Sequence, residues 1–462
     1  MKKSLLLLMM LFSASLFAQD ITGKWQGNLV VPGGKLRLVL NIAAGVGGYT
    51  ATMDSPDQGA KDMPIDKIAF TDNTLTFSIA AAGINYKGKL ENGIIKGTFN
   101  QGTYALALDL SKGEIIEVKA KRPQEPKAPF PYYMEDVTFK NEKAGITLGG
   151  TLTLPKKDGV YPVVILISGS GAQDRNSELM EHKPFLLWAD HLTRNGIGVL
   201  RYDDRGVGKS GGNPVNDTSA DFATDTQAAL DYLKTRKEVN KKKIGLIGHS
   251  EGGLIAQLVA EKNPDIAYIV SLAGPGIKVS ELMILQNYLA GKSDGIPENE
   301  LTAMGVTLRK AYNVIITEND EKIRKATVND ILTKEFGAFF ASKGVPKDEI
   351  GRVIAGQTEQ LTSPWFVYFL RYDPAPVIEK LKCPILALNG SKDIQVAADA
   401  NLDGIKRAAE KSGNKKVVTK KLMNLNHLFQ ECTTGSIQEY GEIEQTIAPV
   451  ALDEVTNWIT KQ

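Results

Sequence analysis

Strand-like apolar runs alternate with helical segments along most of this chain. The runs lie at residues 163–167, 198–202, 244–247, 267–272, 383–388 and 416–422, after two hairpin strands at 137–140 and 149–154. Most of them are apolar throughout, which is typical of strands buried on both faces of a parallel sheet. The alternation predicts an α/β fold with a doubly wound, mostly parallel sheet.

Residues 20–119 show a different pattern of short runs separated by Gly, Asn and Asp turns. The runs lie at residues 25–31, 35–42, 50–53, 66–70, 74–79, 85–90, 93–99 and 104–110. Regularly spaced short strands of this kind predict a small antiparallel β-barrel or sandwich. This segment carries no histidine, paired carboxylates or cofactor motif. We therefore expect it to be a binding or packing module.

Two further segments complete the predicted domain organisation. Residues 120–133 contain four prolines and predict a stiff, extended linker, which places the α/β domain at residues 134–462. Residues from about 280 to 382 interrupt the alternation with helical blocks and predict a cap over the strand ends. Trp365 and Phe366 lie near its aromatic end. They are predicted either to fill the core of the cap or to line a substrate pocket.

The N-terminus indicates export. Residues 1–19 have two lysines, an apolar run and a small residue before the expected cleavage site, as in a signal peptide. That run is too short for a membrane span, and no later segment is long enough. Without residues 1–19 the chain has 53 basic and 53 acidic side chains, which argues against nucleic acid as a partner. We expect a soluble periplasmic or extracellular protein.

Ser250 is the centre of the sequence Gly248-His-Ser-Glu-Gly252, between an apolar strand and a helical segment. A serine on such a tight strand-to-helix turn has a strained backbone, and the flanking glycines avoid a steric clash. This geometry exposes the hydroxyl as a nucleophile. A plain turn serine is the alternative interpretation.

A serine nucleophile needs a base, and that base is usually histidine. Of the four histidines only His427 follows Ser250 in the chain. Asp393 follows the strand at 383–388, where α/β sheets carry their catalytic loops. Asp399 is the rival acid, but it lies in the next helical segment. The order serine, acid, histidine favours Ser250, Asp393 and His427 as the triad.

The oxyanion of an acyl-transfer intermediate needs two backbone N–H donors. One is expected from Glu251, directly after the nucleophile. The other is expected from Ser170, in the glycine-rich loop that follows the strand at 163–167. An ordinary glycine-rich turn is the alternative for this loop.

Several of these blocks together resemble the α/β-hydrolase superfamily, and within it a group of bacterial carboxylesterases. The resemblance covers residues 135–462 and rests on Ile167-Ser-Gly-Ser-Gly-Ala-Gln-Asp-Arg-Asn, Leu200-Arg-Tyr-Asp-Asp-Arg-Gly-Val-Gly-Lys-Ser, Gly248-His-Ser-Glu-Gly-Gly, Leu388-Asn-Gly-Ser-Lys-Asp-Ile-Gln-Val and Asn424-Leu-Asn-His-Leu-Phe-Gln. Many relatives have His-Gly where Ser168-Gly169 stands here. The resemblance also implies that Asp204 and Arg205 form a structural ion pair.

The leading hypothesis is a serine hydrolase that cleaves small carboxylic esters with short acyl chains and uses no metal or cofactor. Two alternatives stay open. One is a serine peptidase or aminopeptidase of prolyl-oligopeptidase type, in which Glu251 binds a substrate amine. The other is a non-catalytic binding protein, against which the complete triad argues. The oligomeric state is not predictable from these patterns.

Overall fold

The computed structural model describes residues 20–462 apart from 32–33, 46, 57–59, 102–103, 114–120, 343–344 and 346. The expected signal peptide, residues 1–19, lies outside this range. By contacts the described residues form two compact units, an N-terminal one over residues 20–113 and a second one over residues 121–462. No helix among the described residues is long and apolar enough to cross a membrane.

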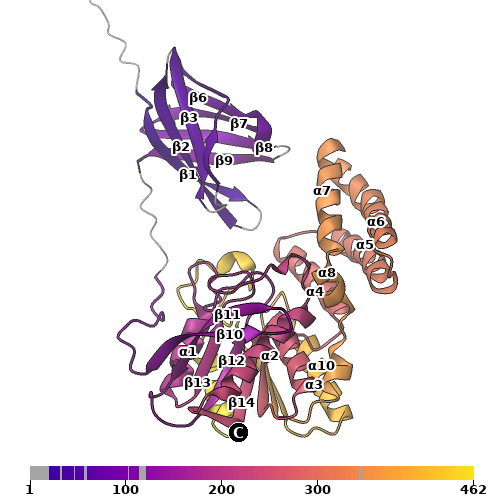
Figure 1. The fold of residues 1–462 in the computed structure, drawn as a ribbon. Helices are drawn as coiled ribbons and strands as arrows, with labels where there is room; N and C mark the ends of the chain where they lie inside the picture. Colours follow the sequence, from indigo (N-terminus) through magenta and orange to yellow (C-terminus); the bar gives the residue numbers. More distant parts are fainter. Residues whose placement is uncertain are drawn as a thin grey trace, which may run out of the picture. The chain divides into compact units, whose positions relative to one another are not determined.

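The N-terminal unit is one curled antiparallel sheet, drawn in indigo and violet in Figure 1. Its order is β4-β3-β2-β1-β9-β8-β7-β6-β5. The strands are β1 (Gly23–Val31), β2 (Gly34–Gly45), β3 (Gly48–Ser55), β4 (Ala60–Pro64), β5 (Lys67–Thr71), β6 (Thr74–Ile79), β7 (Ile84–Glu91), β8 (Ile94–Gln101) and β9 (Tyr104–Lys112). The prediction of a small antiparallel domain is confirmed, as a single curled sheet rather than a sandwich.

The second unit contains the predicted doubly wound sheet, in the order β10-β11-β13-β12-β14-β15-β16-β17. Its strands are β10 (Tyr133–Asn141), β11 (Ile146–Leu154), β12 (Tyr161–Ile167), β13 (Gly198–Tyr202), β14 (Val239–His249), β15 (Tyr268–Leu272), β16 (Ile385–Gly390) and β17 (Val417–Leu422). The hairpin β10–β11 pairs antiparallel to β13, and all later pairings are parallel.

Helices cover both faces of this sheet (Figure 1). One face carries α2 (Ser219–Thr235), α3 (Glu251–Lys262) and α10 (Ala398–Lys411), and the other carries α1 (Pro184–Arg194) and α11 (Pro449–Ile459). The position of β12 between the two cores explains why its sequence is apolar throughout. Val163 and Ile165 pack into the first core, and Val164 and Leu166 into the second. Alternate side chains of a strand point to opposite faces, and here both faces are buried.

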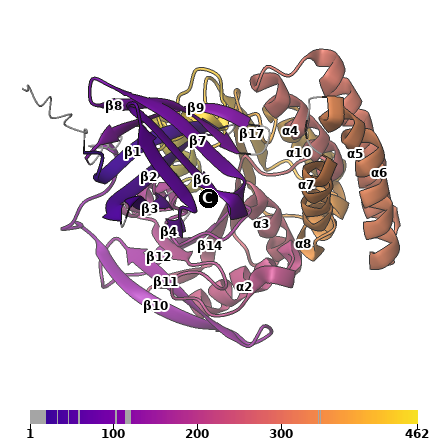
Figure 2. The same ribbon diagram turned by 90° about the horizontal axis from the view of Figure 1, so that it is seen from above.

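The predicted helical cap occupies the interval between β15 and β16. It consists of α4 (Val279–Ser293), α5 (Glu298–Thr317), α6 (Glu321–Ser342), α7 (Lys347–Leu361), α8 (Pro364–Arg371) and α9 (Pro374–Ile378). Figures 1 and 2 show α5, α6 and α7 side by side, away from the sheet, while α8 returns the chain towards it.

The proline-rich segment, residues 121–133, packs onto the α/β unit instead of standing free as a spacer. The Arg122 guanidinium donates hydrogen bonds to the carbonyls of Ile443 (3.0 Å), Gly441 (2.8 Å) and Met180 (2.9 Å). The Gln124 side chain accepts from the Thr446 amide at 2.6 Å and donates to the Ile447 carbonyl at 2.7 Å. These bonds hold the segment 440–447 in place.

This packing predicts where a stable α/β fragment begins. A protein truncated to residues 121–462 should keep the stability of the unit, whereas one truncated to residues 134–462 should lose about 2–4 kcal/mol, because it lacks the side-chain hydrogen bonds of Arg122 and Gln124. Urea unfolding of the two fragments measures the difference. Equal midpoints and slopes would show that these bonds are dispensable.

Candidate active site

Ser250 lies on the predicted elbow between β14 and α3. Its φ of 55° and ψ of −122° are strained for a residue with a side chain. Its amide donates to the Leu272 carbonyl at 2.9 Å, which fixes the turn to β15. A Cβ atom on Gly248 would lie 2.0 Å from the Gly252 carbonyl oxygen, and one on Gly252 would lie 2.2 Å from that of Ile167. The steric requirement for both glycines is confirmed.

The structure brings His427 and Asp393 together. His427 Nδ1 lies 2.8 Å from Asp393 Oδ2, and both residues are about 4% exposed. The other carboxylate oxygen, Oδ1, accepts from the backbone amides of Gln395 and Val396, each at 2.8 Å. With one oxygen held by the backbone, the other is aimed at the imidazole. This arrangement holds the tautomer that leaves Nε2 free to accept a proton.

Asp399, the rival acid, is elsewhere. It lies in the first turn of α10, its side chain is 79% exposed, and it pairs with Lys421 at 2.7 Å. It has no bond to His427.

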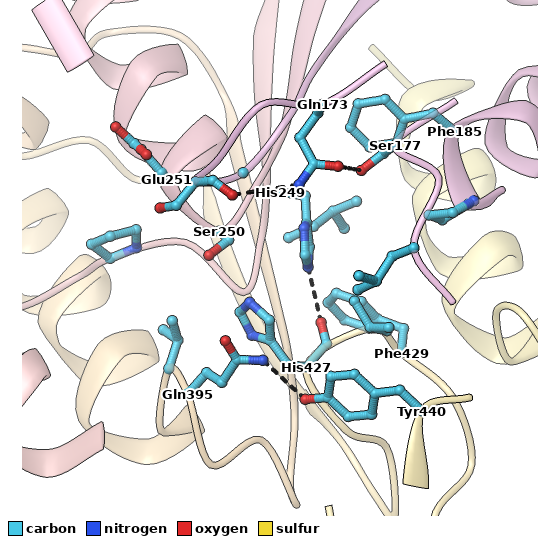
Figure 3. A pocket seen from close by; sticks show the side chains of 18 of the residues that line it. Gln173, Ser177, Phe185, His249, Ser250, Glu251, Gln395, His427, Phe429 and Tyr440 are labelled. Atoms are coloured by element: carbon cyan, nitrogen blue, oxygen red, sulfur yellow. Dashed lines mark hydrogen bonds between the residues drawn. The ribbon is translucent and has the colours of Figure 1, made fainter. Parts of the chain in front are cut away.

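Ser250 and His427 line the same cavity, which has a volume of about 260 Å³. Figure 3 shows the Ser250 hydroxyl directed towards the His427 ring, with Glu251 on one side and Gln395 and Tyr440 on the other. The cap contributes Leu282, Met283 and Gln286 from α4, and Trp365 and Phe369 from α8. The cavity is therefore lined by residues from the sheet ends and from the cap.

His249 directly precedes Ser250, so the expected order of the triad excludes it as the base, but in the structure it contacts the candidate base. Its Nε2 lies 3.0 Å from the His427 carbonyl oxygen, and the two rings are 4.7 Å apart (Figure 3). Burial, and then the neighbouring His427, lower the pKa of His249 to about 3. A neutral imidazole with Nε2–H can donate to that carbonyl, so His249 holds the His427 backbone. The sequence signal that could have indicated this role is the position of His249 next to Ser250 in the Gly-His-Ser-Glu-Gly block.

The two residues expected to donate to the oxyanion, Glu251 and Ser170, both line the cavity that contains Ser250. Glu251 is the first residue of α3, where a backbone N–H has no acceptor within its own helix. Ser170 lines the cavity, and a Cβ atom on the neighbouring Gly169 would lie 3.1 Å from Ser250 Cβ. The glycine-rich loop therefore approaches the serine closely, as an oxyanion loop must.

The Glu251 side chain is sealed within the protein. It is 2% exposed, and its Oε1 accepts from the Ser219 hydroxyl at 2.5 Å and from Trp365 Nε1 at 2.9 Å. The Ser170 hydroxyl is close enough to this carboxylate to act on its pKa. Burial raises the pKa of Glu251 above its usual value, while these donors oppose the shift. The carboxylate thus links the elbow to α2 and to the cap, and it lies beside the glycine-rich loop.

The expected ion pair between Asp204 and Arg205 is wrong. Arg205 binds Asp225 at 2.6 Å and Asp217 at 2.7 Å. Asp204 instead accepts from the Ser168 hydroxyl at 2.6 Å and from a backbone amide of the same loop at 3.0 Å. Successive side chains diverge where β13 ends, so neighbours in sequence acquire different partners. Asp204 therefore braces the glycine-rich loop through Ser168 and the Gln173 amide.

Asp204 also predicts a pH effect on stability. Burial raises its pKa to about 7, against the lowering effect of its two hydrogen bonds, whereas the unfolded chain should have the usual value of about 4. The folded state therefore holds a proton that the unfolded state releases, and stability falls as the pH rises from about 4 to about 7. The loss should reach up to about 4 kcal/mol. Asp204→Asn should flatten this slope in urea unfolding between pH 4.5 and 7.5; parallel curves would contradict the shift.

The two aromatic residues predicted as pocket candidates, Trp365 and Phe366, have different surroundings in the structure. Trp365 lines the cavity, but Phe366 is not among the lining residues. Phe366 is buried against Tyr312 of α5, at 6.0 Å between ring centroids. Consecutive residues of a helix point about 100° apart, so the residue beside Trp365 faces the cap core. Phe369, one turn further along α8, takes the lining position.

Among the described residues no group of three or more His, Cys, Asp or Glu is placed to hold a metal ion.

The chain resembles several known proteins. The family model for serine aminopeptidase, S33, matches residues 182–342. Esterase EstD of Thermotoga maritima is 24% identical over 371 residues, which is 79% of this chain and 78% of that protein. The putative hydrolase YtaP of Bacillus subtilis is 34% identical over 135 residues, which is 26% of this chain and 45% of that protein.

A solved structure of similar arrangement is the esterase Pf2001 of Pyrococcus furiosus. It is 17% identical, has a TM-score of 0.43, and the match covers 74% of this chain and 98% of that one. Three observations support an α/β-hydrolase fold. They are the sheet order with its antiparallel hairpin, the strained serine after β14 and the match along most of EstD. The chain has an α/β-hydrolase fold and resembles carboxylesterases of that superfamily.

Proposed function

We propose that this protein hydrolyses carboxylic esters of small molecules through an acyl-enzyme on Ser250. The observation that carries the proposal is the serine on its strained elbow, in one cavity with a histidine that is bonded to a buried aspartate. These are the parts that nucleophilic acyl transfer needs. The similarity to an esterase along most of the chain supports it.

In the proposed mechanism the Ser250 oxygen attacks the ester carbonyl carbon while His427 Nε2 takes the hydroxyl proton. Asp393 stabilises the resulting imidazolium through Nδ1–H. The N–H groups of Glu251 and Ser170 hold the oxyanion. The carbon–oxygen bond to the alcohol then breaks, and His427 gives the alkoxide its proton. Water, deprotonated by His427, attacks the acyl-enzyme in the same way and releases the acid and Ser250.

The size of the cavity favours short acyl chains. Its volume of about 260 Å³ is below the range of about 300–1,000 Å³ that is usual for drug-sized ligands. Cap residues of α4 and α8 close it on one side. We therefore expect acyl groups of about two to six carbons to be preferred.

The matched family model favours aminopeptidase activity as a second candidate, because its description names that class. An aminopeptidase needs a carboxylate for the substrate's free amine. Among the described residues lining the cavity, Glu251 is the only carboxylate, and it already accepts hydrogen bonds from Ser219 and Trp365. This engagement favours the ester over the peptide.

The two candidates are separated by one screen. We expect the purified protein to hydrolyse p-nitrophenyl acyl esters, with an optimum near two to six carbons, and to leave aminoacyl-p-nitroanilides intact. Higher kcat/KM for the anilides than for every ester would overturn the proposal. An ester optimum at twelve carbons or longer would overturn its short-chain part alone.

A further inference from the structure

A second cavity of about 460 Å³ lies beside the candidate active site. Three residues line both cavities, namely Gly169 and Ser170 of the oxyanion loop and Trp365 of α8. These residues therefore form the wall that separates the two spaces. We call them the partition. No catalytic group of the proposed triad lines the second cavity.

Hydrogen bonds and ring stacking hold the partition in place. Trp365 Nε1 donates to Glu251 Oε1 at 2.9 Å, and the Ser170 hydroxyl lies beside the same carboxylate, close enough to act on its pKa. The Trp365 ring also stacks on Phe369, at 5.2 Å between centroids and 12° between planes. Glu251 is in turn fixed by Ser219 of α2. The indole of Trp365 is thus bonded to a buried carboxylate next to the nucleophile, and Ser170 lies beside the same carboxylate.

The second cavity presents an apolar surface. Its walls include Ile167, Phe222 and Ile255, together with the Trp365 ring. Its charged groups are already engaged, because Arg205 binds two aspartates and lies 5.6 Å over the Phe222 ring. Asp204 is likewise bonded to the oxyanion loop. The space therefore suits an uncharged alkyl chain or ring, and its volume exceeds that of the first cavity.

We propose that Trp365, pinned by Glu251, determines substrate specificity by closing this second cavity, which is a latent subsite for medium-length alkyl or aryl groups of the ester. The proposal rests on the proposed function and extends it to the residues that set its size limit. With the partition closed, the substrate is confined to the first cavity. With the indole removed, the acyl chain passes the oxyanion loop and gains the apolar walls behind it.

The test compares hydrolysis of p-nitrophenyl butyrate and octanoate by the full-length protein and its variants. Trp365→Ala is expected to raise the octanoate-to-butyrate ratio of kcat/KM by about tenfold or more, the discrimination that methylene groups provide in an apolar pocket. The gain should appear mainly as a lower KM for octanoate. Val367→Ala is the matched control, because it trims a buried side chain of the same helix that lines neither cavity. It should leave the ratio unchanged.

Two further variants test the geometry. Phe222→Trp in the Trp365→Ala protein adds a larger ring at another lining position of the second cavity, so it should reverse the gain. Glu251→Leu removes the acceptor that holds the indole and should raise the octanoate ratio in part. Glu251→Gln keeps an amide oxygen for Trp365 Nε1 and should restore the wild-type ratio, a rescue that loss of packing alone would not produce.

The outcomes test the role of Trp365 separately from the proposed ester hydrolysis. A folded Trp365→Ala protein with an unchanged ratio overturns it, and so does an equal shift in Val367→Ala. If Trp365→Ala does not fold, Trp365→Leu, which keeps an apolar side chain on Phe369, is measured in its place. If the wild type cleaves no ester, the proposed function fails. In that case the role of the partition is tested by calorimetry, as the binding of phenyl octyl ketone to the Ser250→Ala protein and to the Ser250→Ala, Trp365→Ala double variant. Tighter binding to the double variant supports the proposal about the partition, and equal binding to both proteins refutes it.

Discussion

Ser250→Ala and His427→Ala are each expected to lower kcat for p-nitrophenyl acetate by on the order of 10⁶-fold, because without either residue no activated nucleophile forms. The hydroxyl and the imidazole line one cavity, and among the described histidines only His427 is hydrogen-bonded to a carboxylate, that of Asp393. His191→Ala is the matched control. This histidine lies on α1 near Asp453, so its loss should leave kcat unchanged.

The double variant adds a stricter test. Members of a triad act as one unit, so Ser250→Ala with His427→Ala should be scarcely slower than either single variant. Steady-state rates at saturating ester, with unfolding curves to confirm the fold, provide the comparison. Losses that multiply in the double variant, or substantial activity in either single one, would contradict the assignment.

Asp393→Asn is expected to lower kcat by on the order of 10⁴-fold while the fold stays intact, because an amide no longer holds the required imidazole tautomer. Its Oδ1 can still accept from the amides of Gln395 and Val396, so the loop should keep its shape. The paired control is Asp399→Asn, which removes only an exposed ion pair with Lys421 and should leave the rate unchanged. The reverse result in a kcat assay would show that the acid is misplaced.

The sheet of the α/β unit and the elbow were predictable because they follow from local patterns. Apolar runs such as residues 163–167 and 244–247 are long enough to be recognised as buried strands. Gly248 and Gly252 flank Ser250 because backbone atoms approach within about 2 Å of any added Cβ. The expected order of serine, acid and histidine agrees with a structure in which Asp393 meets His427.

Side-chain partners were less predictable, because they depend on where a chain turns. Arg205 binds Asp225, twenty residues away, and not its neighbour Asp204. Strand β4 was missed because its sequence, Ala-Lys-Asp-Met-Pro, has no apolar alternation and its pairing is irregular. The proline content of residues 121–133 indicated an extended conformation, but nothing in it indicated which surface Arg122 would bind.

Covalent labelling with an alkyl fluorophosphonate tests the central claim most directly. The reagent should inactivate ester hydrolysis in step with the addition of one phosphonyl group, and peptide mapping by mass spectrometry should place that group on Ser250. The Ser250→Ala protein should remain unlabelled. Complete inactivation with the adduct on another residue, or full activity with Ser250 stoichiometrically modified, would contradict the proposal that Ser250 is the nucleophile.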